Sequence, residues 1–347
     1  MSITSTAPTP PFNAVSLRQD AGVIGLVGLA HMISHFSQLL LAPLFPWLKE
    51  EFSVSYAELG FLMTIFFVVS CAVQALSGFV VDRFGPRPIL FAGLSLLGLA
   101  AFGYAVSTSY WMMAAFAVLA VLVLHRDKLT IRIVPPVQGA PVVDSSLGFL
   151  KIPAVWMCFA FFFWYAIVLS VVQAFAPEAA RQLHKVPLGL VAMCLTIYMV
   201  CSAGGMVLGG FLASDPARCE RVVGAGFGLA AVVALVLALG SFPAWMVPVL
   251  FGVMGFASGI AGPSRDLLVK RSTPDNASGR VYGVVYAGLD IGQAISPLIF
   301  GVMMDHGQYR GVLLGLALMQ GVLIASAFNV RRVRRTALAP APGTVAG

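Results

Sequence analysis

Asp290 is the residue best placed to do proton chemistry, because it is an acid inside a long apolar stretch, 281–305. If this stretch is a helix that crosses a bilayer, Asp290 lies about 14 Å from its start, near the middle of the hydrocarbon. An ionised carboxylate there costs about 2.5–3.5 kcal/mol on insertion scales, so its side chain should face the protein interior. A carboxyl in that position can gain and lose a proton during a working cycle. The alternative is a structural acid that joins helices through hydrogen bonds.

A second polar set lies on one helical face of another apolar stretch, 21–48. His31, Ser34, His35 and Gln38 follow offsets of 0, 3, 4 and 7, which one face of a helix brings together. His31 lies about 15 Å from the start of the stretch. These side chains either line a water-filled cavity or hold helices together through interhelical hydrogen bonds. The histidine spacing also suits a metal, but no carboxylate accompanies the pair, so we expect no metal site.

These two polar sets predict a proton-coupling group beside a substrate cavity. Tyr286 and Gln293 share the helical face of Asp290, four residues before it and three after it. We expect proton coupling to involve Asp290, His31 and His35. We expect the cavity to be lined by Ser34, Gln38, Tyr286 and Gln293.

The elements that carry these residues are membrane spans. The 347 residues are 59% hydrophobic and only 10% charged, too little charge to cover the surface of a soluble domain of this length. The net charge of +7 comes from basic residues in short turns between apolar runs, which argues for membrane orientation and against nucleic acid. The five cysteines form no C-x-x-C pair, so we expect neither a disulfide framework nor a metal knuckle.

Ten apolar stretches are candidates for spanning helices, so the expected fold is all-α, a polytopic helical bundle. The run 110–124 is short, reaching only about 22 Å, and needs flanking residues or a thinner bilayer in order to cross. The predicted spans are 21–48, 57–81, 88–106, 110–124, 152–176, 187–212, 221–240, 243–264, 281–305 and 309–330.

The distribution of basic residues supports ten spans with both termini on the inner side. In that topology the only Lys and Arg residues outside, of 21 in the chain, are Lys49, Arg181, Lys185 and Arg310. If 110–124 did not cross, most of the basic residues would lie outside, against the positive-inside rule. The expected domains are a cytoplasmic tail 1–20, a four-span bundle 21–124, a linker 125–151, a six-span bundle 152–330 and a basic tail 331–347. We expect the inner membrane of a bacterium.

A charged segment between the second and third spans carries the most specific motif. The pattern G-x-x-x-D-R-x-G-x-R falls on Gly78, Asp82, Arg83, Gly85 and Arg87. It resembles the loop between helices two and three of the major facilitator superfamily of transporters. An ordinary basic turn that obeys the positive-inside rule is the alternative. The resemblance implies two six-helix halves related by duplication, so the first half, with four spans, lacks about two helices.

A second charged segment, the predicted inner loop 265–280, contains Arg265, Asp266 and Arg280. Together with Gly-Leu-Asp290-Ile-Gly-Gln and Pro43-Leu-Phe-Pro46, it resembles the fosmidomycin-resistance branch of drug exporters. The resemblance implies a cytoplasmic gating contact in which Asp82 meets the inner end of the penultimate helix. The alternative is that these loops only set topology. Glycine pairs four residues apart are expected to mark close helix packing: Gly205/Gly209, Gly255/Gly259 and Gly311/Gly315.

These features predict a secondary transporter that exports small amphipathic compounds or drugs by alternating access, through proton-coupled antiport. Its partners would be a small-molecule substrate, protons and the lipid bilayer, with no cofactor and no nucleic acid, and we expect a monomer. Organic-phosphate exchange is an alternative within the family. The alternative from another class is a non-transporting remnant, either a membrane binding or sensing protein or an inactive deletion product. The sequence contains no G-x-S-x-G, H-E-x-x-H or phosphate-loop motif, so we do not expect an enzyme.

Overall fold

The computed structural model describes residues 41–84, 95, 98–116, 153–213, 218–272 and 278–338, and every regular element in these ranges is a helix. Four predicted cavity or proton-coupling residues, His31, Ser34, His35 and Gln38, lie outside the described residues, as do Gly85, Arg87 and the linker 125–151. The named elements are η1 (Ala42–Leu44), α2 (Phe45–Phe52), α3 (Tyr56–Phe84), α6 (Pro153–Ala174), α7 (Ala176–His184), α8 (Leu188–Leu212), α9 (Cys219–Leu239), α10 (Met246–Ser272), α11 (Ser278–Asp305) and α12 (Tyr309–Leu338).

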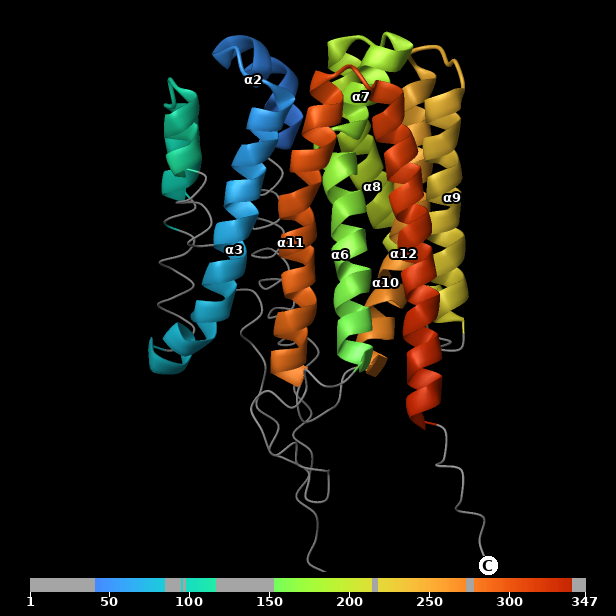
Figure 1. The fold of residues 1–347 in the computed structure, drawn as a ribbon. Coiled ribbons are helices and arrows are strands. Elements are labelled where there is room, and N and C mark those ends of the chain that lie inside the picture. Colours follow the sequence, from blue (N-terminus) through green and yellow to red (C-terminus); the bar gives the residue numbers. More distant parts are fainter. Residues whose placement is uncertain are drawn as a thin grey trace, which may run out of the picture.

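Six helices in the described part of the chain are long and apolar enough to cross a membrane, and they match the six spans predicted after the linker. They are Val155–Ala174, Leu188–Leu212, Cys219–Leu239, Met246–Leu267, Val284–Asp305 and Tyr309–Asn329. In Figure 1 these helices run side by side, with α2 and α7 at the upper end, here called the α7 end. Helical segments also lie at 98–105 and 110–116, separated by the predicted turn at 107–109.

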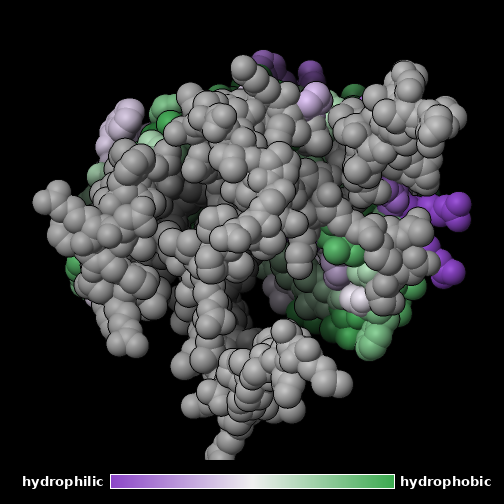
Figure 2. Space-filling model, turned by 90° about the horizontal axis from the view of Figure 1, so that it is seen from below, coloured by the Kyte–Doolittle hydropathy of each residue, from purple (hydrophilic) through white to green (hydrophobic). Residues whose placement is uncertain are grey.

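The outward faces of the helices are apolar, as a bilayer requires. Large hydrophobic side chains such as Val207, Phe211 and Leu239 are exposed. The view from below, opposite the α7 end, shows hydrophobic surface in green along parts of the rim (Figure 2). Water would not tolerate so much exposed apolar surface on a monomeric soluble protein, whereas lipid solvates it.

Glycines bring α8 and α10 into backbone contact. A Cβ on Gly205 or Gly209 would collide with the carbonyl oxygens of Phe256 and Ile260. On the facing helix, a Cβ on Gly255 or Gly259 would collide with the carbonyl oxygens of Tyr198 and Ser202. The predicted packing role is therefore confirmed for these two pairs. The third pair, Gly311/Gly315, instead accommodates the α11 side chains of Met303 and Phe300.

The helix α11 lies between α3 and α6 in Figure 1, and glycines bring it close to α6. A Cβ on Gly288 would lie 2.7 Å from the carbonyl oxygen of Phe159, and one on Gly292 would collide with that of Phe163. These two glycines flank Asp290, so the local sequence fixes how closely this part of α11 approaches α6.

Three helices end later than predicted: α3, α10 and α12, of which the last continues to Leu338 where the predicted span ended at 330. The helix α10 continues to Ser272, so Arg265 and Asp266 lie within a helix, and the predicted inner loop 265–280 is wrong for them. Likewise α3 continues to Phe84 through Asp82 and Arg83. The predictions ended each helix where apolar residues ended, whereas backbone hydrogen bonds continue a helix into polar surroundings.

No helix was predicted between 176 and 187, where the structure has α7. This helix starts with Pro177 in its first turn, has Glu178 in that turn and Arg181 near its end, and stops at Lys185 in a left-handed conformation with φ of 55°. Pro near the start, an acid in the first turn and a base in the last are standard signals of a helix. The segment was missed because it is too short and too polar to span.

Candidate functional site

Asp290 is buried in the middle of α11. Its exposed fraction is 8%, and it lies twelve residues, about 18 Å, from the start of the helix at Ser278. One turn further along α11, the carbonyl oxygen of Ala294 accepts a hydrogen bond from Thr64 of α3. The carboxyl therefore faces protein, as the sequence predicts, and is held where α11 meets both α3 and α6. A role in proton transfer stays a prediction.

The two other predicted cavity residues on α11 accompany Asp290. Gln293 is buried and Tyr286 is half-buried. The Tyr286 ring packs edge to face on Phe162 of α6, with 5.5 Å between ring centroids. The described part of the predicted cavity thus consists of a buried acid and amide, Asp290 and Gln293, and of Tyr286, whose ring contacts α6.

The interface between α3 and α11 was not predicted and joins the two halves of the chain. The hydroxyl of Thr64 donates a hydrogen bond of 2.8 Å to the carbonyl oxygen of Ala294. A Cβ on Gly60 would lie 2.8 Å from the Cβ of Pro297, and one on Gly301 would lie 2.9 Å from the Cα of Ala57. In the run 57–81, Gly60 and Thr64 lie four residues apart on one helical face, a pattern that could have predicted a helix contact here.

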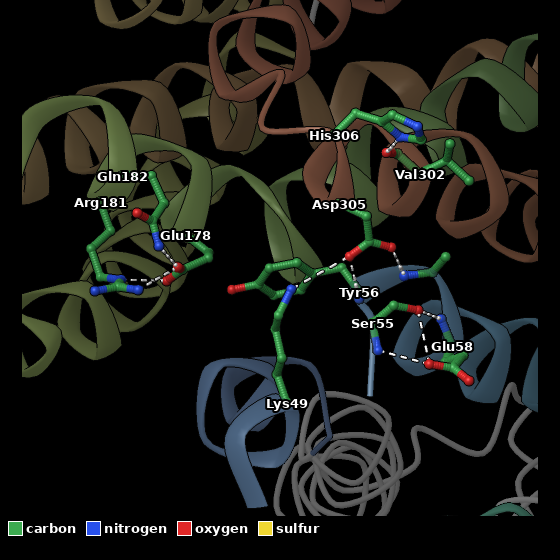
Figure 3. Close-up of polar contacts among 11 residues, drawn as sticks. Lys49, Ser55, Tyr56, Glu58, Glu178, Arg181, Gln182, Val302, Asp305 and His306 are labelled. Atoms are coloured by element: carbon green, nitrogen blue, oxygen red, sulfur yellow. Dashed lines mark hydrogen bonds and ion pairs between the residues drawn. The ribbon is translucent and has the colours of Figure 1, made fainter. Parts of the chain in front are cut away.

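At the α7 end of this interface, Asp305 caps the amino terminus of α3 (Figure 3). Its carboxylate accepts hydrogen bonds from the backbone N–H groups of Tyr56, at 2.7 Å, and Ala57, at 2.8 Å. Lys49 Nζ lies 3.5 Å from the same carboxylate and 4.0 Å from the centroid of the Tyr56 ring. A carboxylate satisfies N–H groups that a helix start leaves unpaired and interacts favourably with its dipole. We call this contact the Asp305 cap.

The same helix start carries the pattern Ser55-x-x-Glu58, which predicts a capping box. The Glu58 carboxylate accepts a hydrogen bond of 2.8 Å from the Ser55 backbone N–H, and the Glu58 N–H donates one of 3.1 Å to the Ser55 hydroxyl. The box is therefore confirmed. It lies beside the Asp305 cap in Figure 3, so α3 begins with one local cap and one supplied by α11.

A buried acid on α7 lies near the cap. Glu178 is only 3% exposed and accepts three hydrogen bonds of 2.7 Å, from Nε and Nη2 of Arg181 and from the amide of Gln182. Figure 3 shows the Tyr56 ring extending from the cap toward this group. The hydrogen bonds to Glu178 raise the pKa of Arg181, so this guanidinium stays charged. Glu178 and Arg181 thus form a structural ion pair at the α7 end.

Arg265 lies against the aromatic residues of α6. Its guanidinium carbon is 4.3 Å from the ring centroid of Tyr165 and 5.7 Å from that of Phe162. Its Nε donates a hydrogen bond of 2.8 Å to the carboxylate of Asp266, and the side chain is 18% exposed. The structure does not describe the side chains of Asp82, Arg83 and Arg280, so the gating contact expected from the sequence stays a prediction. Phe162 and Tyr165 were not predicted as site residues, because both lie in an almost uniformly apolar run.

No group of three or more His, Cys, Asp or Glu residues that could hold a metal occurs among the residues for which the structure gives positions. The pair His31 and His35 is not among them.

Comparison with known proteins identifies the family. A model described as Major Facilitator Superfamily matches residues 27–125 and 154–346. The chain is 30% identical over 91 residues to the fosmidomycin resistance protein of Escherichia coli (strain K12), a stretch that covers 24% of this chain and 22% of that protein. It is 28% identical over 75 residues to the probable sulfoacetate transporter SauU of Cupriavidus necator, covering 22% of this chain and 17% of that one. These alignments thus span about a fifth of the length of each curated relative.

Solved structures show the fold. A mutant form of the nucleoside transporter NupG superimposes with a TM-score of 0.67 at 13% identity, covering 88% of this chain and 99% of that one. A bacterial homologue of the human lysosomal transporter Spinster, in an inward-facing and occupied conformation, gives 0.55 at 14% identity, covering 94% and 100%. At such identities the likeness concerns the fold alone. Because the family model matches most of its length, the chain belongs to the Major Facilitator Superfamily, and its six long apolar helices make it a multi-pass integral membrane protein.

Proposed function

We propose that the chain is a secondary active transporter that works by alternating access, with the α3/α11 interface as a contact that opens and closes. The observation that carries this proposal is the one-sided closure of the interface. Near the α7 end the two helices touch at Gly60, Gly301 and the Asp305 cap. Toward the other end, Figure 1 shows α3 leading away from α11. Two helices, one from each half, that touch at one end and diverge toward the other correspond to one state of an alternating-access cycle.

Proton coupling is assigned to Asp290, with His31 and His35 as partners, and the cavity to Ser34, Gln38, Tyr286 and Gln293. What supports this is the burial of Asp290 at mid-helix among polar and aromatic neighbours. Asp290→Asn cannot release a proton, so proton-driven flux in sealed vesicles should fall to background. Glu51→Gln, which alters an exposed acid, is the matched control and should keep native flux. Undiminished proton-driven uptake by Asp290→Asn contradicts the assignment.

The substrate class is small amphipathic compounds, moved outward. The name of the Escherichia coli relative points to drug resistance, while those of SauU and NupG point to sulfoacetate and nucleosides. Efflux of a fluorescent dye from cells that make the chain, with and without an uncoupler, tests export and its coupling together. If the uncoupler leaves the export rate unchanged, the proposal of proton-coupled antiport is wrong.

The competing function is a non-transporting membrane protein, favoured by the four spans predicted in the first half where the superfamily pattern has six. It predicts dye efflux no faster than in cells with an empty vector, even when the chain is abundant in the membrane. Vesicle assays on purified chain then decide between inactivity and an unsuitable dye.

The proposed cytoplasmic gate is a contact between the charged motif and the start of α11. The motif residues are Gly78, Asp82, Arg83, Gly85 and Arg87. Both termini are assigned to the cytoplasm of a bacterial cell, and the chain to a monomer. A carboxy-terminal fusion to a reporter that is active only in the cytoplasm tests the orientation. Activity seen instead with a reporter that works only in the periplasm would reverse it.

A further inference from the structure

We propose that Arg265 binds the anionic group of the transported compound, so that the site accepts small organic anions such as carboxylates, sulfonates or phosphonates. This inference rests on the proposed transport function, because it names the substrate class of the same cavity. It replaces the interpretation of Arg265 as part of a surface loop, since Arg265 lies in the helix α10 and inside the apolar segment Met246–Leu267.

The first step is the position of the charge. Arg265 lies two residues before the end of the apolar segment Met246–Leu267, so its guanidinium is at the edge of the hydrocarbon, beside the exposed Asp266. Arg265 is nineteen residues from Met246, about 28 Å along the helix and away from the α7 end. The cost of burying this charge is offset by the ring faces of Tyr165 and Phe162, at 4.3 and 5.7 Å. The Nε and Nη2 groups of Arg265 both contact one carboxylate oxygen of Asp266, at 2.8 Å, and an oxyanion that displaces Asp266 can accept hydrogen bonds from the same groups.

The second step is the nature of the existing counter-ion. Asp266 is 58% exposed, whereas Arg265 is 18% exposed, so the acid is the solvated member of this pair. A solvated carboxylate adds little to an ion pair, and another anion can replace it at small cost. The Glu178–Arg181 pair has the opposite arrangement, because there the acid is the buried partner and accepts three hydrogen bonds. An external anion therefore cannot easily displace Glu178 from Arg181, whereas it can displace the exposed Asp266 from Arg265.

The third step is the connection to the candidate cavity. Phe162 packs on Tyr286 of α11, which lies one turn before Asp290. The rings of Phe162, Tyr165 and Tyr286 thus lead from the guanidinium toward the buried acid. An anion with an apolar or aromatic body can place its charge on Arg265 and its body against these rings. The arrangement suits an amphipathic anion better than a bare inorganic ion.

The test is equilibrium binding of phenylphosphonate to the purified full chain in nanodiscs, followed by calorimetry, with benzyl alcohol as the uncharged comparison. We expect phenylphosphonate to bind and benzyl alcohol to bind much more weakly. Arg265→Gln should weaken phenylphosphonate binding roughly ten- to a hundredfold, the range for one charged hydrogen-bonding group. Arg310→Gln, at an exposed arginine near the α7 end, is the matched control and should bind as the native chain does. Asp266→Asn should bind more tightly, because it removes the competing anion.

Three results overturn the inference: no binding to the native chain, native affinity in Arg265→Gln, or weaker binding in Asp266→Asn. If Arg265→Gln does not fold, the native chain still gives an answer. Phenylglyoxal modification of Arg265, read by mass spectrometry, should slow when phenylphosphonate is present, and an unchanged rate counts against the site. Binding without transport leaves this inference standing and removes the proposed function. Transport of neutral dyes that does not depend on Arg265 supports the proposed transport function and contradicts the anion site at Arg265.

Discussion

Two helix interfaces in this protein use glycine in the same way and otherwise differ. Between α8 and α10, glycines on both helices allow backbone contact over about three turns, from Tyr198 to Gly209. Between α3 and α11, the glycine contacts are at Gly60 and Gly301, in the half nearer the α7 end, and they finish at the Asp305 cap. The first interface lies within the six-span half, and the second joins the two halves.

The difference suggests which interface stays closed. Backbone contact in the middle of a membrane has no alternative partner once it is lost, so α8 and α10 should move as one body. The Asp305 cap is at the surface, where water can take over the hydrogen bonds of Asp305, the Tyr56 N–H group and Lys49. At the Asp305 cap, opening of the α3/α11 interface therefore costs less than separation of the buried backbone contacts between α8 and α10.

The largest expected effect is at α8/α10. Gly259→Ala introduces a Cβ that collides with the carbonyl oxygen of Ser202, and backbone cannot move aside as a side chain can. We expect a loss of stability of about 1–3 kcal/mol or more, measured as a lower unfolding temperature in detergent. Gly204→Ala is the matched control, since nothing lies within 4 Å of its added Cβ. It should be neutral or slightly stabilising, because alanine favours a helix. Equal losses in both variants would show that the interface is not the cause.

The next effect is at the Asp305 cap. Asp305→Ala removes two hydrogen bonds and an ion pair between the halves. We expect the closed state to lose about 1–3 kcal/mol relative to the open one, a shift of roughly tenfold or more in population. A cysteine placed at Thr64, in a chain whose native cysteines have been replaced, should react faster with an impermeant maleimide.

Ser55→Ala controls for simple fraying of α3, because it removes the local capping box and leaves Asp305 in place. It should lower helix stability by about 1 kcal/mol and leave the labelling rate of the Thr64 position nearly unchanged. If both variants speed labelling equally, the cap does not hold the halves together.

A smaller and more discriminating effect is expected at Gly301. A Cβ there would lie 2.9 Å from the Cα of Ala57 and 3.0 Å from the carbonyl oxygen of Tyr56. Because this interface can separate, Gly301→Ala should relieve the clash by opening. We expect faster labelling at Thr64 with a much smaller fall in unfolding temperature than Gly259→Ala gives. A fall as large as that of Gly259→Ala would mean that the two interfaces are equally fixed.

The sequence predicts one of these interfaces far better than the other. Length and hydropathy gave six spans that match α6 and α8–α12, and glycines four residues apart identified the packing of α8 on α10. Asp290 was predicted to be buried from its position alone, and it is. These inferences depend on the periodicity of single helices, which is a local property.

The residues that sequence reasoning missed all depend on distant pairing. Asp305 lies 249 positions from Tyr56, and Thr64 lies 230 from Ala294. Nothing in the local pattern around Asp305 distinguishes a helix-capping acid from an ordinary charge at a membrane boundary. Arg265 was assigned to a loop because its charge marked the end of an apolar run, while the rings that hold it lie about 100 positions earlier. Which helices are neighbours is a property of the whole fold.

The smallest expected effect separates the charge of the cap from its hydrogen bonds. Lys49 is 38% exposed and 3.5 Å from Asp305, so solvent screens most of this ion pair. Lys49→Met keeps the length of the side chain and should cost about 0–1 kcal/mol. Labelling at Thr64 should therefore change far less than in Asp305→Ala, and what change there is should disappear at 1 M salt, where the Debye length is about 3 Å. If Lys49→Met raises the labelling rate at Thr64 as much as Asp305→Ala does, the ion pair provides most of the free energy that favours the closed state. Closure would then weaken with ionic strength, and the hydrogen bonds from Tyr56 and Ala57 would only position Asp305.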